Sequence, residues 1–236
     1  MPAETTTISA NLERVRERIS RASARAWRQP EEITLVAVSK TFPPEAIRAV
    51  YDLGVRHFAE NRVQEFEAKQ PKLVSLRAAW HFIGHLQRNK ARRAVYLFSR
   101  IDGVDSLTLA QTLESEAEAQ GKRMPILIEV RLGDEPSKTG VAEPNLPALA
   151  ETIVPASNLW LRGLMGVPPY FEDPERTRPY FTKLRKMRDE LSSRLGSPLP
   201  VLSMGMSHDF EIAIEEGATE IRIGTALFGE RPRAEA

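Results

Sequence analysis

Short apolar runs rich in β-branched residues alternate along this chain with segments whose apolar residues recur at helical spacing. Such alternation predicts strands that pair in parallel through right-handed helical crossovers. Eight strand–helix units in about 200 residues fit a closed (β/α)8 barrel of the TIM type. We expect strands to begin near Ile33, Val55, Trp80, Phe98, Pro125, Leu159, Leu199 and Glu220. Helices are expected over 43–53, 62–76, 87–97, 107–119, 146–153, 175–195 and 209–216.

An open, doubly wound sheet is the alternative arrangement of the same elements. That fold normally has a glycine-rich turn after its first strand. The residues after the first predicted strand are Ser39, Lys40 and Thr41, which do not form such a turn. The pattern therefore favours the barrel, with residues 1–236 as a single domain.

An amphipathic helix is expected over residues 8–28, before the first strand. Its apolar positions repeat at helical spacing, which predicts packing on the barrel with arginines on the solvent side. RNA binding by these arginines is the alternative, although solvated arginines are the more common explanation for such a face. The apolar positions are Leu12, Val15, Ile19, Ala22 and Ala26, and the arginines are Arg14, Arg16, Arg18, Arg21, Arg25 and Arg28.

The composition narrows the class of protein. Of the 236 residues 42% are hydrophobic and 28% charged, with a formal net charge of +1. This balance is typical of a globular protein and gives no general attraction to nucleic acid or membranes. The absence of cysteine excludes disulfides and thiolate chemistry. No apolar stretch approaches the ~20 residues of a membrane span, and the first residues do not resemble a signal peptide. We expect a cytoplasmic protein, and a monomer because no exposed apolar stripe is evident.

Lys40 is the first candidate for chemistry. It follows the apolar run over 33–39 and precedes Pro43 and Pro44, where a helix is expected to begin. In a barrel this position faces the mouth at which active sites are built. A partly desolvated amine there favours its neutral form, which attacks a carbonyl to give a Schiff base. On position alone, however, an ordinary surface lysine is the commoner outcome.

Two other loops at the same mouth predict a phosphate site. Gly224 and Thr225 end the last strand at the start of a helix, and the loop over 203–207 contains two serines around Gly205. Glycine lets backbone N–H groups approach a phosphate, the hydroxyls donate hydrogen bonds, and a helix N-terminus adds partial positive charge. In barrels such sites commonly form after strands 7 and 8. Each motif alone more often only caps a helix.

With Lys40 across the same mouth, these loops describe a pocket for a small molecule that carries a phosphate and an aldehyde. Pyridoxal 5′-phosphate (PLP) fits that description. Arg222 lies two residues before Gly224, on the same strand face, and so is placed to reach toward the ligand's ring nitrogen. An arginine stays protonated, which would leave that nitrogen neutral. An ion pair between Arg222 and a neighbouring helix is an equally plausible alternative at this point.

Seven ordered motifs resemble the pyridoxal phosphate homeostasis protein family, whose fold is similar to the barrel domain of bacterial alanine racemase. The resemblance covers almost the whole chain. Ala59 and Arg131 depart from it, since glycine and asparagine are the residues associated with these positions in the family. The matching segments are 35–41, 60–65, 81–90, 137–140, 161–165, 202–209 and 222–229.

The resemblance implies that Lys40 carries PLP as a Schiff base and that Arg222 faces the ring nitrogen. Asn61 would line the ring pocket, with Ser203 and Met204 as neighbours. The residues implied to hold the phosphate are Ser207, Gly224 and Thr225. The family's implied role is to bind PLP and keep vitamin B6 in balance inside the cell, without established turnover, and with apo-forms of PLP enzymes as possible recipients.

A PLP-dependent amino-acid racemase is the alternative function. Racemisation needs an acid/base group on each face of the bound substrate, and Lys40 supplies only one. In alanine racemase the second is a tyrosine from a further domain of a partner subunit, whereas the only tyrosine expected near this mouth is Tyr170. The sequence therefore favours a binding protein. An interaction or RNA-binding protein is a third class, for which the arginine-rich helix would matter most.

No metal site is expected. His81 and His85 would lie about 13 Å apart along a strand, too far to share an ion. No third ligand is evident. The loop over 133–140 lacks the glycine spacing of a nucleotide-binding loop. We expect its charged residues, Asp134, Glu135 and Lys138, to form a solvated flap over the mouth.

Overall fold

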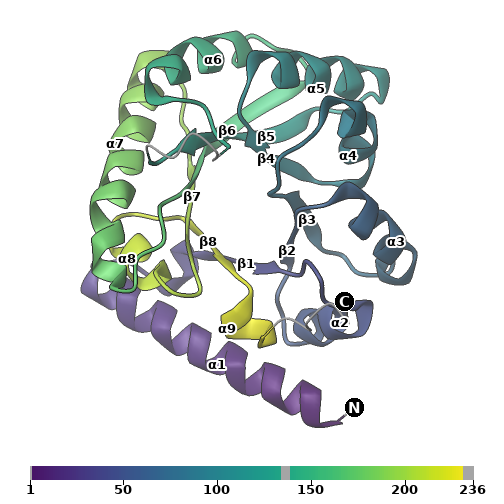
Figure 1. The fold of residues 1–236 in the computed structure, drawn as a ribbon, viewed down its shortest axis with the longest axis vertical. Coiled ribbons are helices and arrows are strands. Elements are labelled where there is room, and N and C mark those ends of the chain that lie inside the picture. The colour runs from purple at the N-terminus through teal and green to yellow at the C-terminus, as the bar shows by residue number, and fades with distance from the viewer. Residues whose placement is uncertain (1, 134–138, 231–236) are drawn as a thin grey trace.

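The computed structural model describes residues 2–133 and 139–230 and contains a closed barrel of eight parallel strands (Figure 1). The strands follow one another around the barrel in chain order, and β8 pairs with β1 to close it. The predicted (β/α)8 barrel is therefore confirmed and the open sheet is excluded. The strands are β1 Thr34–Val38, β2 His57–Glu60, β3 Ala79–Phe82, β4 Arg100–Val104, β5 Met124–Arg131, β6 Leu159–Val167, β7 Val201–Met206 and β8 Glu220–Ile223.

Strand β1 shows why these apolar runs become barrel strands. Val36, Ala37 and Val38 are all buried. Ala37 belongs to the large core between the barrel and its helices, whereas Val36 and Val38 pack with Ala59 and the half-buried Ile83 in a separate interior cluster. Because successive side chains face opposite sides of a strand, the apolar residues of β1 contribute alternately to these two clusters.

The helices surround the barrel as Figure 1 shows. Two predicted helices begin as 3-10 turns, Arg88–Lys90 before α4 and Pro174–Thr177 before α7, and a one-turn helix, α9, follows β8. Within the described part of the chain, no helix is long and apolar enough to cross a membrane. The helices of the barrel are α2 Pro44–Asp52, α3 Val63–Leu73, α4 Ala91–Leu97, α5 Leu107–Ala119, α6 Leu146–Ile153, α7 Arg178–Leu195, α8 Phe210–Glu215 and α9 Thr225–Phe228.

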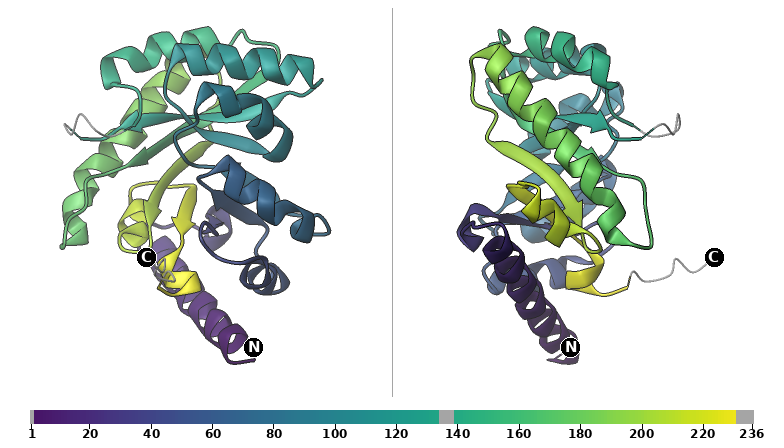
Figure 2. Two further views of the ribbon diagram at one scale, coloured as in Figure 1. Left: turned by 45° about the vertical axis from the view of Figure 1, so that its right-hand side comes forward. Right: turned by 90° about the vertical axis from the view of Figure 1, so that its left-hand side faces the viewer.

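Helix α1, Pro2–Arg25, is the predicted amphipathic helix, and it lies alongside α8 and α9 (Figures 1 and 2). Two of its arginines form ion pairs with α8. Arg18 is 2.8 Å from Glu211 and Arg25 is 2.6 Å from Glu215. These arginines serve the packing of α1 on the barrel, which weakens the case for an RNA-binding face. The buried apolar residues of the helix include Leu12, Val15, Ile19 and Ala22.

Helix α1 ends at Arg25 rather than at residue 28, because the chain leaves the helical conformation at Trp27. The φ angle of Trp27 is 56°, and the Arg28 N–H donates to the Ser23 carbonyl at 2.9 Å. A left-handed residue followed by such a backward hydrogen bond is a common way to end a helix. Helical spacing alone does not reveal this turn, since the residue that adopts it is usually glycine.

Candidate functional site

A cavity of about 200 Å³ opens at the mouth of the barrel, beside the carboxyl end of β1. It brings together five of the residues predicted from the sequence, which come from β1, β7 and β8 and the loops that follow them. Because β8 pairs with β1, with Ala37 opposite Ile223, the lysine and the predicted phosphate loop are neighbours rather than lying across the mouth. The residues lining the cavity are Val38, Lys40, Phe42, Ile83, Met206, Ser207, His208, Arg222, Gly224 and Thr225.

Arg222 reaches inward from β8, as predicted. It is buried, and its guanidinium donates to Ser203 Oγ at 2.8 Å and to the Gly166 carbonyl at 3.0 Å. Both acceptors are neutral barrel groups, so the alternative of an ion pair with a neighbouring helix is wrong. Burial lowers the pKa of Arg222, against the pull of nearby carboxylates, chiefly Glu220.

Ser203 and Met204, two further predicted residues, do not line the cavity. Ser203 is buried below Arg222 and holds its guanidinium. Met204 is buried in the large core that the barrel shares with its helices. The two residues are consecutive on β7, so their side chains take opposite faces of the strand. In the structure Ser203 supports Arg222 and Met204 is part of the core; that both neighbour a ligand, as the resemblance implies, stays a prediction.

Asn61 follows β2, which is paired with β1; it is half-buried and is not among the residues that line the cavity. Its Oδ1 atom is buried and has no hydrogen-bond partner among the described residues. A Cβ on Gly84 would lie 2.3 Å from the Asn61 carbonyl, so only glycine at 84 allows the backbone of 61 to take this place. A buried acceptor without a partner suits a site that receives a hydrogen-bonding ligand.

The side of the cavity where a phosphate is predicted has one contact between the loops after β7 and β8 and one within the loop after β7. Ser207 Oγ accepts from the Ala226 N–H at 3.1 Å, and Asp209 Oδ1 accepts from the Met206 N–H at 2.7 Å. Helix α9 has only four residues. It therefore gives less dipole than a longer helix would, and an anion here would depend on individual N–H and hydroxyl groups for its hydrogen bonds.

Gly224 is not required by the packing of the protein itself. A Cβ at this position would meet only Val38, at 3.6 Å, which is ordinary van der Waals contact. Its φ of −111° lies outside the left-handed region that favours glycine. Because Gly224 and Val38 both line the cavity, a side chain here would reduce the space for a ligand and leave the fold undisturbed.

Several residues of the site were not predicted. Phe42 lines the cavity and stacks on Phe228 at 4.6 Å between ring centroids, which ties the loop after β1 to α9. His208 lines it too, and its position directly after Ser207 was an available signal. Glu129, on β5, is not among the residues that line the cavity; it is buried and accepts from the Thr139 hydroxyl at 2.9 Å, and burial raises its pKa. The predicted flap residues Asp134, Glu135 and Lys138 lie outside the described residues.

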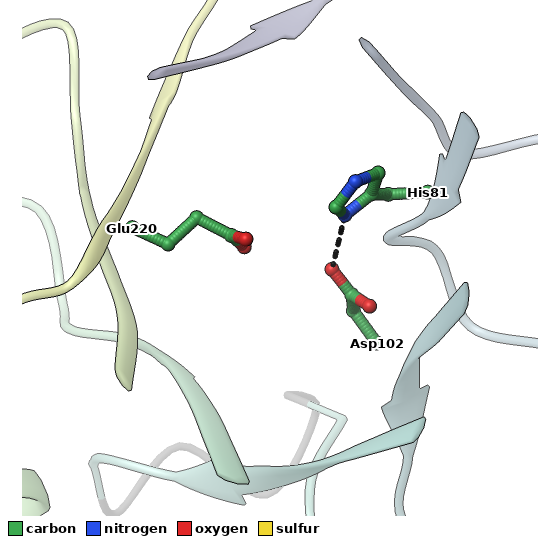
Figure 3. Close-up of side chains that lie close together, drawn as sticks. All are labelled: His81, Asp102 and Glu220. Atoms are coloured by element: carbon green, nitrogen blue, oxygen red, sulfur yellow. Dashed lines mark ion pairs between the residues drawn. The ribbon is translucent and has the colours of Figure 1, made fainter. Parts of the chain in front are cut away.

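Charged residues also fill the barrel interior along β3, β4 and β8, where His81, Asp102 and Glu220 approach one another (Figure 3). One potential metal-ligand atom from each lies within 4.8 Å of the others. The structure thus brings Asp102 and Glu220 near His81, which the sequence did not reveal. The guanidinium of Arg100 already neutralises the two carboxylates: it lies 2.6 Å from Asp102 Oδ1 and 2.6 Å from Glu220 Oε1. His85 is apart from this group, in the loop after β3, at 3.3 Å from Asp105.

This geometry is that of a buried ion-pair network rather than a metal centre. Burial alone would raise the pKa of Asp102, but the charge and hydrogen bonds of Arg100 outweigh it and hold that pKa well below its usual range. His57 extends the network, with its Nδ1 atom 3.0 Å from Nε2 of His81. A divalent cation here would have to displace a guanidinium that already has short hydrogen bonds to both carboxylates.

The fold and the cavity define a class of protein, an alanine-racemase-like barrel with a lysine at its mouth. A family model described as the alanine racemase N-terminal domain matches residues 10–232. The alanine racemase of Clostridium difficile superposes with a TM-score of 0.75 at 15% identity, over 95% of this chain and 57% of that one. This likeness concerns the fold alone.

Two relatives are more similar. The pyridoxal phosphate homeostasis protein of Aquifex aeolicus is 49% identical over 220 residues, which cover 93% of this chain and 96% of the relative. PipY of Synechococcus elongatus, whose structure has PLP bound, superposes with a TM-score of 0.80 at 38% identity, over 90% of this chain and 100% of that one. The chain belongs to the pyridoxal phosphate homeostasis protein family.

Proposed function

We propose that this chain binds PLP as a Schiff base on Lys40 and takes part in keeping the cell's vitamin B6 in balance. The observation that carries the proposal is the cavity itself, in which one amine, one buried guanidinium and a glycine–hydroxyl loop converge. The bound PLP in the structure of PipY and the name of the Aquifex relative support it.

Each residue would have a separate task. When bound, PLP supplies an aldehyde and an electron-withdrawing ring. Lys40 would form the covalent link, and Arg222, fixed by Ser203 and Gly166, would donate toward the ring nitrogen. The Oδ1 atom of Asn61, which has no hydrogen-bond partner among the described residues, would accept a hydrogen bond near the ring. The residues proposed to hold the phosphate are Ser207, Gly224 and Thr225.

Replacing Gly224 with alanine should weaken PLP binding by about 10- to 100-fold, which corresponds to the loss of one or two charge-assisted hydrogen bonds to the phosphate. The fold should be unaffected, because the new Cβ meets only Val38 at ordinary distance. Equilibrium titration of the visible absorbance with PLP measures the affinity, and thermal unfolding of the apo-protein checks the fold.

Pyridoxal, which lacks the phosphate, provides the matched control for this variant. It should react with Lys40 equally well in the Gly224→Ala variant and in the unsubstituted protein, because only the phosphate side has changed. Equal PLP affinity in the two proteins would contradict the placement of the phosphate beside Gly224.

Racemisation is supported less well than binding. Tyr170, the tyrosine expected near the mouth, is 77% exposed and lies against His208, with 5.5 Å between the ring centroids. It is not among the residues that line the cavity. The Aquifex relative is also named for homeostasis of PLP rather than for a reaction.

Wider features of the proposed function are still predictions from the sequence. These are a single PLP-binding domain over 1–236, a monomer, a cytoplasmic location and apo-forms of PLP enzymes as recipients. A transfer experiment tests the last of them. Activation of an apo-enzyme faster than PLP leaves this protein spontaneously would indicate direct hand-over.

A further inference from the structure

Lys69 is a buried lysine that the proposed function does not use. It lies on α3 with 8% of its surface exposed, and lysines are seldom buried unless they are paired. Its ammonium donates to the Ser39 carbonyl at 3.1 Å, to Glu60 Oε1 at 3.1 Å and to Glu65 Oε1 at 2.7 Å. These three acceptors match the three N–H donors of a lysine side chain.

The three acceptors belong to, or bond to, the residues on either side of Lys40. The Ser39 carbonyl belongs to the peptide that joins Ser39 to Lys40. Glu65 Oε1 also accepts from the N–H of Thr41, the residue after Lys40, at 2.6 Å. Glu60 Oε1 accepts from the Ser39 hydroxyl at 2.8 Å. A single ammonium therefore connects to the chain immediately before and immediately after the proposed Schiff-base lysine.

The backbone at Thr41 has a conformation that surrounding contacts must stabilise. Thr41 has a φ of 70°, a left-handed conformation that is unusual for a β-branched residue. Strained conformations of this kind persist only where surrounding contacts fix them, and they cluster at ligand sites. The Glu65 carboxylate bonded to the Thr41 N–H is such a contact, and Lys69 holds that carboxylate in place.

Resting on the proposed function, we propose that Lys69 is a positioning residue for Lys40, which orients the amine toward the cavity by clamping the peptide groups of Ser39 and Thr41. Lys69 does not line the cavity and so acts through the backbone. The helix α3 serves as the rigid support of the clamp. Its role is thus separate from those proposed for Asn61 and Arg222, which would contact the ligand directly.

The Lys69→Met variant tests this role, because methionine keeps an unbranched side chain and removes the ammonium. With the peptide groups of residues 39 and 41 released, Schiff-base formation with PLP should slow by about 10- to 100-fold, the usual effect of a small misplacement of a reacting group. The visible circular dichroism of bound PLP should weaken, since it reports a fixed orientation. Stopped-flow absorbance and circular dichroism measure the two effects.

Hydrogen exchange gives a readout that needs no PLP. In the apo-protein, amides of residues 39–42 should exchange faster in Lys69→Met than in the unsubstituted protein, while β1 and α3 keep their protection. The matched control is Lys72→Met on the same helix. Lys72 is 69% exposed at its side chain and is paired only loosely with Glu45, at 3.9 Å, so its loss should change neither readout.

Glu65→Ala is the second variant, should Lys69→Met fold poorly. It removes the acceptor of the Thr41 N–H and leaves Lys69 paired with Glu60, so the same slowing and the same faster exchange are expected. Absence of any PLP band in the unsubstituted protein would overturn the proposed function and this role with it. A normal band that forms at the normal rate in Lys69→Met, with unchanged exchange, would overturn the positioning role alone.

Discussion

Replacing Arg100 with methionine is expected to lower the free energy of unfolding by about 3–5 kcal/mol. Arg100 is the cation between two buried carboxylates inside the barrel, at 2.6 Å from both Asp102 and Glu220. Its loss leaves both carboxylates buried without their counter-ion. The matched control is Arg93→Met, which breaks an exposed ion pair with Glu67 and should change stability by less than ~1 kcal/mol. Urea denaturation at pH 7 measures both.

The pH dependence separates loss of charge from loss of packing. The pKa of Asp102 in the folded protein lies below its unfolded value, so its ionised form contributes stability above about pH 4, and this contribution declines as the pH falls. Without Arg100, burial would instead raise the pKa of Asp102, and the variant should gain stability toward pH 4. The difference between the two proteins should therefore shrink in acid. A difference that stays constant from pH 7 to 4 would mean that only packing was lost.

Replacing Lys40 with alanine should abolish the absorbance band near ~420 nm that a Schiff base with PLP gives. The phosphate contacts at Ser207, Gly224 and Thr225 would remain, so PLP should still bind, more weakly and without covalent attachment. Absorbance spectra after removal of free PLP by gel filtration measure this. Lys72→Ala, which changes an exposed lysine, is the control. A band of normal intensity in Lys40→Ala would place the covalent link on another amine.

The barrel could be predicted from the sequence because short strand-like runs, of which β1 is the most apolar, alternate with helical segments along the chain. Parallel pairing of these strands through right-handed crossovers then leaves few possible topologies. The position of Lys40 at the mouth followed from the end of one such run. The ends of helices were less predictable: α1 ends at Arg25 because Trp27 takes a conformation usual for glycine, and periodicity carries no signal for that.

The charged interior could not be predicted, since it depends on contacts between distant parts of the chain. Arg100 and Glu220 are separated by 120 positions, and they meet only because the closed barrel lets side chains from β4 and β8 share its interior. Lys69 likewise reaches Ser39 across 30 positions. Met204 shows a further limit, because a motif match does not say which face of a strand a residue occupies, and this one faces the core.

The central claim is that the amine of Lys40 forms the covalent link to PLP. Reduction of the PLP-loaded protein with borohydride, followed by proteolysis and mass spectrometry, tests it most directly, because reduction turns the Schiff base into a permanent bond on the residue that formed it. A single reduced adduct on the peptide containing Lys40 is the predicted result. An adduct on a different lysine, or none after stoichiometric loading, would contradict the claim.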